Sequence, residues 1–371
     1  MRRGLSLYLD LLRFLLALTV MLGHATEPGY IGRLSEVWTF PHYGLTAVMG
    51  FFVLSGFVIA HVTQGSESRP TDYFAARAAR MYSIVIPALL LTALLGVAGA
   101  FINPETYLHG PIHVGAHQPR RYFLTALFAQ DFWIWRREMT PGINHPFWSL
   151  SYEVTYYVLF GLTLVRRPRV AVLGGLALLC LAGPKIAALL PIWVLGVLAY
   201  RGTRRFTLPA PLCAVLMIGT LCGLYVTGTY RGADDPVNRY TLDYLEGFLF
   251  AVNIIAAAGL APWLERALGW CPRFIRWLGM LTFALYLCHR PLMYFLSAVP
   301  MGAPGEWRQS AWLFGMTLAV VIGIAHLGEW FRGGLRRSLT RLLPQIPLHR
   351  APLAATPGCL PGSSSGTTAP R

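Results

Sequence analysis

Long apolar runs restrict this chain of 371 residues to the membrane-spanning class of folds. Hydrophobic residues make up 55% of the chain and charged residues only 13%, whereas a soluble domain usually carries about 25% charged residues. Apolar runs close to the ~18 residues of a spanning helix occur near 8–25, 44–62, 81–101, 148–165, 209–228, 243–260, 277–297 and 309–331. Residues 170–200 are interrupted by Pro184 and Lys185 and fit two shorter helices. The sequence therefore predicts an all-α polytopic bundle of about ten transmembrane helices.

The distribution of basic residues predicts the orientation of these helices. Lys and Arg outnumber Asp and Glu by 31 to 16, but the arginines form short clusters between apolar runs, which is typical of membrane topology rather than of nucleic-acid binding. The 14 residues of segment 122–135 reach only about 21 Å and are too short to cross. If the segment stays on one side, most Lys and Arg fall in cytoplasmic loops, and letting it cross reverses that balance. We therefore expect a multi-pass protein of a bacterial-type inner (plasma) membrane with both termini cytoplasmic, and an extracytoplasmic stretch over 102–147 with a re-entrant or interfacial helix.

Two further patterns carry little chemistry. The six cysteines are scattered without a CxxC pair and predict neither disulfides nor a zinc site. His109, His113 and His117 are spaced by four, but glycines and a proline between them break any helix, so a loop rather than a metal site is expected.

Residues 338–371 begin basic and become rich in Pro, Gly, Ser and Thr, which predicts a disordered cytoplasmic tail after a membrane domain over 1–337.

The first apolar run contains three ionisable residues that lipid disfavours: Asp10, Arg13 and His24, in LDLLRFLLALTVMLGHA (residues 9–25). A charge at the bilayer centre costs about 2.5–3.5 kcal/mol on insertion scales. Arg13 and His24 are eleven residues apart, so a helix places both on one face, about 16 Å apart along its axis. Asp10 can pair with Arg13. The residues could simply anchor the two interfaces, but a shared face also predicts a polar cavity through the bundle.

Five motifs in one order resemble the acyltransferase-3 family of integral membrane acyltransferases. The first is LDLLRFLLALTVMLGHA, and the others are FFVLSGFVIA (51–60), Arg77-Ala-Ala-Arg80, PFWSLSYEVTYYVLF (146–160) and LTFALYLCHRPLM (281–293). The resemblance implies transfer of an acyl group, usually acetyl from acetyl-CoA, to a hydroxyl of a cell-surface or exported polysaccharide or a lipid-linked sugar. Some members of the family acylate small molecules such as macrolides. The partners to expect are then acyl-CoA, a glycan or lipid-linked sugar acceptor and the lipid bilayer, with no metal and no nucleic acid.

Ester formation needs a base for the acceptor hydroxyl and positive groups for the donor. His24, which the resemblance matches to the family's essential histidine, is the expected base. Arg13 cannot lose its proton, so we expect it to line the donor path, held by Asp10. Arg77 and Arg80 suit the phosphates of coenzyme A, although arginines are common at any inner helix end.

Two residues keep open roles at this point. Glu153 lies early in an inward-running helix, at a depth comparable with His24, and could orient the imidazole, bind sugar hydroxyls or help cap its helix. His289 could line the same cavity or be a structural histidine. The alternatives for the whole chain are a transporter or flippase, since buried ionisable groups also mark transport pathways, and a non-enzymatic partner in polysaccharide export.

Overall fold

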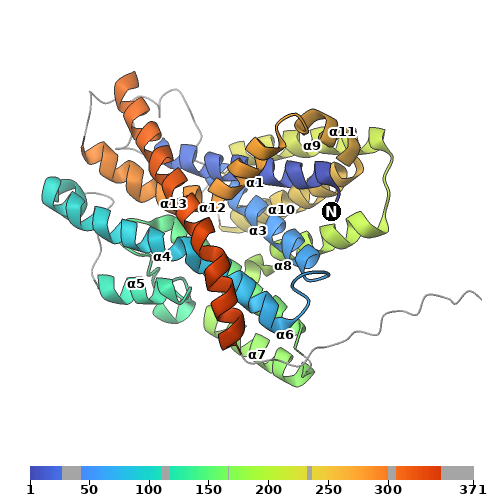
Figure 1. Cartoon of the computed structure of the whole chain (residues 1–371), viewed down its shortest axis with the longest axis horizontal. Helices are drawn as coiled ribbons and strands as arrows, with labels where there is room; N and C mark the ends of the chain where they lie inside the picture. The colour runs from blue at the N-terminus through green and yellow to red at the C-terminus, as the bar shows by residue number, and fades with distance from the viewer. Residues whose placement is uncertain (27–42, 110–116, 166, 232–235, 300–305, 344–371) are drawn as a thin grey trace, which may run out of the picture.

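The computed structural model describes residues 1–26, 43–109, 117–165, 167–231, 236–299 and 306–343, and this part of the chain is helical (Figure 1). The helices are α1 (Arg3–Ala25), α3 (Tyr43–Val62), α4 (Pro70–Ile102), α5 (Gln118–Ala126), α6 (Trp148–Thr163), α7 (Pro168–Ala182), α8 (Pro184–Arg205), α9 (Ala210–Thr229), α10 (Pro236–Gly259), α11 (Ala261–Leu268), α12 (Pro272–Ala298) and α13 (Trp307–Leu342). Single turns lie at Glu105–His109, Trp133–Trp135 and His145–Phe147. The predicted all-α class is confirmed.

Seven of these described helices are long and apolar enough to cross a membrane: α1, α3, α4, α8, α9, α10 and α13. The predicted count of about ten is not confirmed, because α6 and α7 have only 16 and 15 residues. The third helix in question, α12, has 27 residues but carries Arg273, Arg276 and Arg290. The chain is therefore a multi-pass helical protein, and α6, α7 and α12 fall short of a spanning helix in length or apolar character.

The break between α7 and α8 confirms the expected pair of helices over 170–200. It lies at Gly183, whose φ of 99° is in the left-handed region that favours glycine, and Pro184 then begins α8. The two helices are unequal, because Pro191 is accommodated inside α8 and the helix continues to Arg205.

Helix α4 begins eleven residues before the predicted start at 81. Pro70 occupies the first turn and Asp72 follows it, both of which favour a helix N-terminus, and alanines separate the later arginines. The apolar run marked only the part of the helix that is lipid-like. Arg77 and Arg80 consequently lie within a continuous helix rather than in a preceding loop.

Segment 122–135 does not form a spanning helix. Helix α5 covers only nine residues, about 14 Å, and is followed by a turn at Trp133–Trp135. At the other end of the chain α13 runs to Leu342, five residues beyond the predicted end of the membrane domain at 337. The predicted disordered tail otherwise lies outside the described residues.

Helix α1 packs against α3, α10, α11 and α12 (Figure 1). Small residues set the closest approaches elsewhere: a Cβ added to Gly56 of α3 would lie 2.0 Å from the Trp193 carbonyl oxygen of α8, and one added to Gly196 would lie 2.0 Å from that of Val53. The two backbones therefore touch directly. The long helix α13 crosses over α4 in Figure 1 and packs against both α4 and α12.

Candidate active site

A cavity that is partly open to solvent lies between α1, α3, α4, α6 and α12, and with the open solvent at its mouth it holds about 840 Å³. Its walls are largely apolar, with Leu9, Phe51 and Phe283 among the lining residues. The polar side chains that line it are Arg13, Ser55, Arg77, Arg80, Ser149, Glu153, Tyr157, Thr282 and Tyr286. Four of the five residues proposed from the sequence thus share one cavity, although they come from three helices far apart in the chain.

Three arginines give this cavity an excess of positive charge. Arg13 forms an ion pair with Asp10, one turn earlier on α1, as expected from their spacing. The Arg77 guanidinium donates to both carboxylate oxygens of Glu67 at 2.9 Å. For Arg80 the described residues offer no acidic side chain within ion-pair distance. The lining itself contains only one carboxylate, Glu153, so the cavity suits an anionic ligand.

Glu153 is held by hydroxyl donors. Ser55 of α3 donates to its Oε1 at 3.2 Å, and the hydroxyl of Tyr157, one turn along α6, donates to the same oxygen. The indole Nε1 of Trp193 donates to the Ser55 hydroxyl at 3.1 Å, and the Arg77 guanidinium lies 5.9 Å from the Tyr157 ring centre. The structure thus places Glu153 among the arginines.

His24 stacks on His289. The ring centres are 5.2 Å apart with planes inclined by 27°, which joins α1 to α12. His289 is buried, and its Nδ1 lies 2.8 Å from the Leu285 carbonyl oxygen. A carbonyl only accepts, so the Nδ1 of His289 carries a proton in this arrangement.

The histidine pair is separate from the arginine cavity. His24 is not among the residues that line it, and the stretch of α1 between Arg13 and His24 buries Leu16, Ala17 and Val20 in the core. The cavity at Arg13 thus does not include His24 among its described lining residues, and a polar cavity along the whole helix face stays a prediction. The two places are close along α12, since Tyr286 lines the cavity and His289 follows one turn later.

A break in the hydrogen bonding of α12 lies next to the histidine pair. Pro291 has no N–H to donate to the carbonyl of Leu287, four residues earlier. The Asn144 side chain donates to that oxygen at 2.8 Å and to the Thr92 hydroxyl at 2.9 Å. Asn144 is fully buried, so an amide from the segment before α6 satisfies a carbonyl that proline leaves open.

Sequence reasoning missed several residues that shape these two places. Ser55 and Tyr157 are inside two of the quoted motifs, but only the packing of α3 against α6 shows that both donate to Glu153. No motif in the sequence pointed to Asn144. The only indication was Pro291 inside the late helix, which leaves a backbone carbonyl without its usual N–H donor. Among the described residues no group of His, Cys, Asp and Glu is placed to hold a metal ion, and His113 lies outside them.

The helices define a multi-pass membrane protein, and three arginines line a cavity in its interior. A family model, described as an Acyltransferase domain (acyltransferase 3), matches residues 6–327, nearly the whole chain. The chain belongs to this family, whose members are acyltransferases, and it is accordingly an enzyme that transfers acyl groups other than aminoacyl groups. No curated protein and no solved structure matches it.

Proposed function

We propose that this protein moves an acyl group, acetyl in the simplest case, from acyl-CoA to a hydroxyl of a cell-surface or exported polysaccharide or of a lipid-linked sugar. It would act in a bacterial-type inner membrane with both termini in the cytoplasm. The observation that carries the donor assignment is the convergence of Arg13, Arg77 and Arg80 on one cavity with a single lining carboxylate.

Coenzyme A matches this cavity by charge. Its diphosphate needs several cationic donors, and guanidinium groups bind phosphate through paired N–H groups. In the proposal Arg80, which has no acidic partner among the described residues, and Arg77 bind phosphate, while Arg13 lines the path of the donor beyond them. Arg13 and His24 are about 16 Å apart along α1, so the arginines and the histidine act on different parts of an extended donor.

The proposed chemistry takes place at His24. Its imidazole removes the proton of the acceptor hydroxyl as that oxygen attacks the thioester carbonyl carbon. The new C–O bond forms, the C–S bond breaks, and the imidazolium returns its proton to the departing thiolate, which leaves as coenzyme A. His289 is the side chain stacked on this imidazole, and its role in the proposal is to hold the ring in place.

Glu153 is proposed to act on the donor side of the transfer site. It accepts hydrogen bonds from two hydroxyl groups and faces the cavity that contains the arginines, so it balances their charge and orients them. A direct role in binding sugar hydroxyls requires the acceptor to enter the same cavity.

The proposal is tested by incubating the purified protein with acetyl-CoA labelled in the acetyl group and a panel of glycans, lipid-linked sugars and macrolide-like alcohols. Label is expected on one acceptor class, and His24→Ala is expected to abolish it while the variant still inserts into membranes. A protein that moves an acceptor across vesicles without labelling it would be a transporter. Label transferred at wild-type rate by His24→Ala would remove this histidine from the mechanism.

A further inference from the structure

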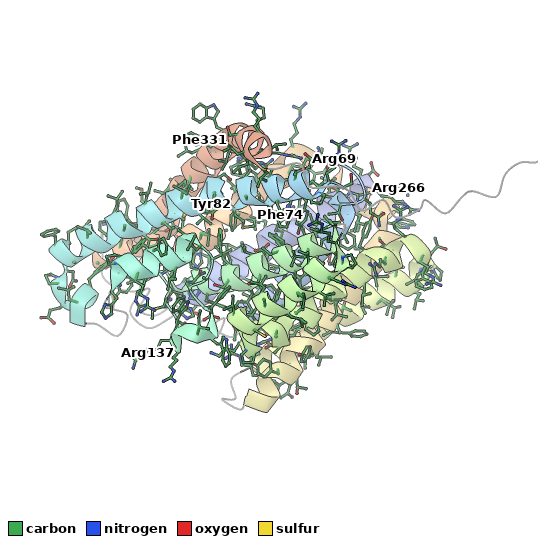
Figure 2. The ribbon with its side chains drawn as sticks, turned by 90° about the horizontal axis from the view of Figure 1, so that it is seen from below. Arg69, Phe74, Tyr82, Arg137, Arg266 and Phe331 are labelled. Atoms are coloured by element: carbon green, nitrogen blue, oxygen red, sulfur yellow. The ribbon has the colours of Figure 1, made fainter. Side chains whose placement is uncertain are left out.

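The two longest helices meet at the arginine end of the bundle. Helix α4 has 33 residues and α13 has 36, about 50 and 54 Å, whereas a hydrocarbon core is about 30 Å thick. Both helices therefore extend beyond the core. Figure 2 labels Arg69 just before α4, Phe74 and Tyr82 on α4, and Phe331 on α13, which packs against α4.

A close contact fixes how the two helices align. A Cβ added to Gly328 of α13 would lie 2.2 Å from Cδ1 of Ile84 and 3.0 Å from the carbonyl oxygen of Ser83. One turn further along α13 is Arg332, and one turn earlier on α4 is Arg80. Arg332 is accordingly close enough to Arg80 and Arg77 for their charges to repel it, and Arg336 lies near it on its own helix.

Placing like charges close together is unfavourable, because each unneutralised guanidinium raises the electrostatic free energy of the next. Glu329 pairs with Arg332 at 2.8 Å, but Arg80 has no acidic partner among the described residues. The location of arginines at one membrane face explains their number, since topology favours basic residues there. It does not explain why Arg332 is placed beside the two arginines of the α4 motif.

The geometry points to Arg332, with Arg336 beside it, as the site for the 3′-phosphate of coenzyme A, next to the diphosphate site at Arg77 and Arg80. This inference rests on the proposed donor and extends it to a residue of the last helix. The 3′-phosphate and the diphosphate are separate anionic groups of one nucleotide, and two neighbouring pairs of arginines on α4 and α13 match that arrangement. Arg332 thus becomes a specificity residue that selects coenzyme A over a carrier without the 3′-phosphate.

Calorimetry with the purified full-length protein in detergent tests the assignment, using coenzyme A and dephospho-coenzyme A as ligands. Arg332→Gln is expected to weaken binding of coenzyme A about tenfold, as for loss of a charge-assisted hydrogen bond, and to leave binding of dephospho-coenzyme A within about twofold. Arg332→Lys is expected to retain most of the selectivity. Arg341→Gln makes the same change of charge nine residues further along α13 and is expected to alter neither affinity.

The outcomes separate this inference from the function on which it rests. Equal loss of affinity for both ligands in Arg332→Gln, or no loss for coenzyme A, overturns the assignment while leaving acyl-CoA as donor. Failure of the wild-type protein to bind either ligand overturns both. Because Arg332 is about half exposed, its replacement is expected to leave the elution profile in size exclusion unchanged.

Discussion

The hydroxyl groups of Ser55 and Tyr157 hold the Glu153 carboxylate in place. Ser55→Ala removes one donor from Glu153 and the acceptor of the Trp193 indole. We expect the turnover number to fall about tenfold or more, because a hydrogen bond to a carboxylate is worth about 1.5–3 kcal/mol. Ser55→Thr keeps the hydroxyl and is expected to restore most of the rate.

Steady-state transfer of labelled acetyl measures this effect. The matched control is Thr282→Val, which removes a hydroxyl from the same cavity that bonds only within α12, at 3.4 Å to the Leu278 carbonyl oxygen. Equal losses in Ser55→Ala and Thr282→Val would mean that the cavity tolerates no change of polarity, and would argue against a specific role in holding Glu153.

Asp131, in the segment between α5 and α6, gives a pH-dependent prediction. Burial raises the pKa of its carboxyl above the ordinary value, and a hydrogen bond from Tyr152 only partly opposes this. The neutral form is therefore favoured in the folded protein, so the stability it provides is present at low pH and is lost as pH rises through the raised pKa. Asp131→Asn, which is neutral at every pH, is expected to raise Tm above the wild-type value at about pH 8 and to match it at about pH 4.

Thermal unfolding in detergent at the two pH values checks the sign. Glu138→Gln is a useful comparison, because the hydrogen bond from His145 lowers the pKa of Glu138, and this change is expected to be destabilising at neutral pH instead. A gain in Tm for Asp131→Asn that is equal at both pH values would show that burial of the charge is not its cause.

At the scale of one helix, α12 depends on a side chain from outside it. Asn144→Ala leaves the Leu287 carbonyl oxygen without its donor in the buried surroundings of the histidine pair. We expect a loss of about 1–3 kcal/mol in stability. Pro291→Ala supplies a backbone N–H to the same oxygen, so Asn144→Ala is expected to cost less in that background.

A double-mutant cycle measured by unfolding in mixed detergent tests this coupling. The double variant is expected to lose less stability than the sum of the two single variants, with the remaining cost of Asn144→Ala reflecting its bond to Thr92. Simple additivity of the two changes would show that the amide does not replace the missing N–H.

The helices differ in how well the sequence predicted them. The apolar runs located α3, α6 and α9 within a few residues at both ends, because lipid allows little else over that length. They missed the first eleven residues of α4, because this helix start contains Asp72, Arg77 and Arg80 and is polar. Its helical structure is stabilised by the residues of its first turn and by its alanines rather than by hydrophobic residues.

The site was predicted where the information is local to one helix. The ion pair between Arg13 and Asp10 follows from their spacing of three residues. The same spacing brings Arg77 and Arg80 to one cavity. The stacking of His24 on His289 and the hydrogen bond from Ser55 to Glu153 depend on which helices pack together and at which height. One sequence does not contain that register, so the two histidines remained separate candidates.

For the molecule as a whole, the structure restricts the number of crossings. Arg2, before α1, lines a pocket with His61 at the end of α3 and Arg204 at the end of α8. Helix α4 starts a few residues after α3, and the basic end of α13 passes beside that start. The beginning of α1 and the end of α13 thus lie at the same end of the bundle, which leads us to expect an even number of crossings.

Seven crossings would place those two ends on opposite sides, so we expect α6, α7 and α12 to cross as well, giving ten. Fusions of a fluorescent protein that matures only in the cytoplasm are expected to fluoresce after Arg169 and after Leu342, and fusions of alkaline phosphatase are expected to be active after Arg137. Fluorescence after Arg137 together with phosphatase activity after Arg169 would show that the helices after α4 have the opposite orientation in the membrane. In the proposed function the donor comes from the cytoplasm, so that result would also separate the α13 arginines from the side on which coenzyme A arrives, and the topology and the donor site are tested together.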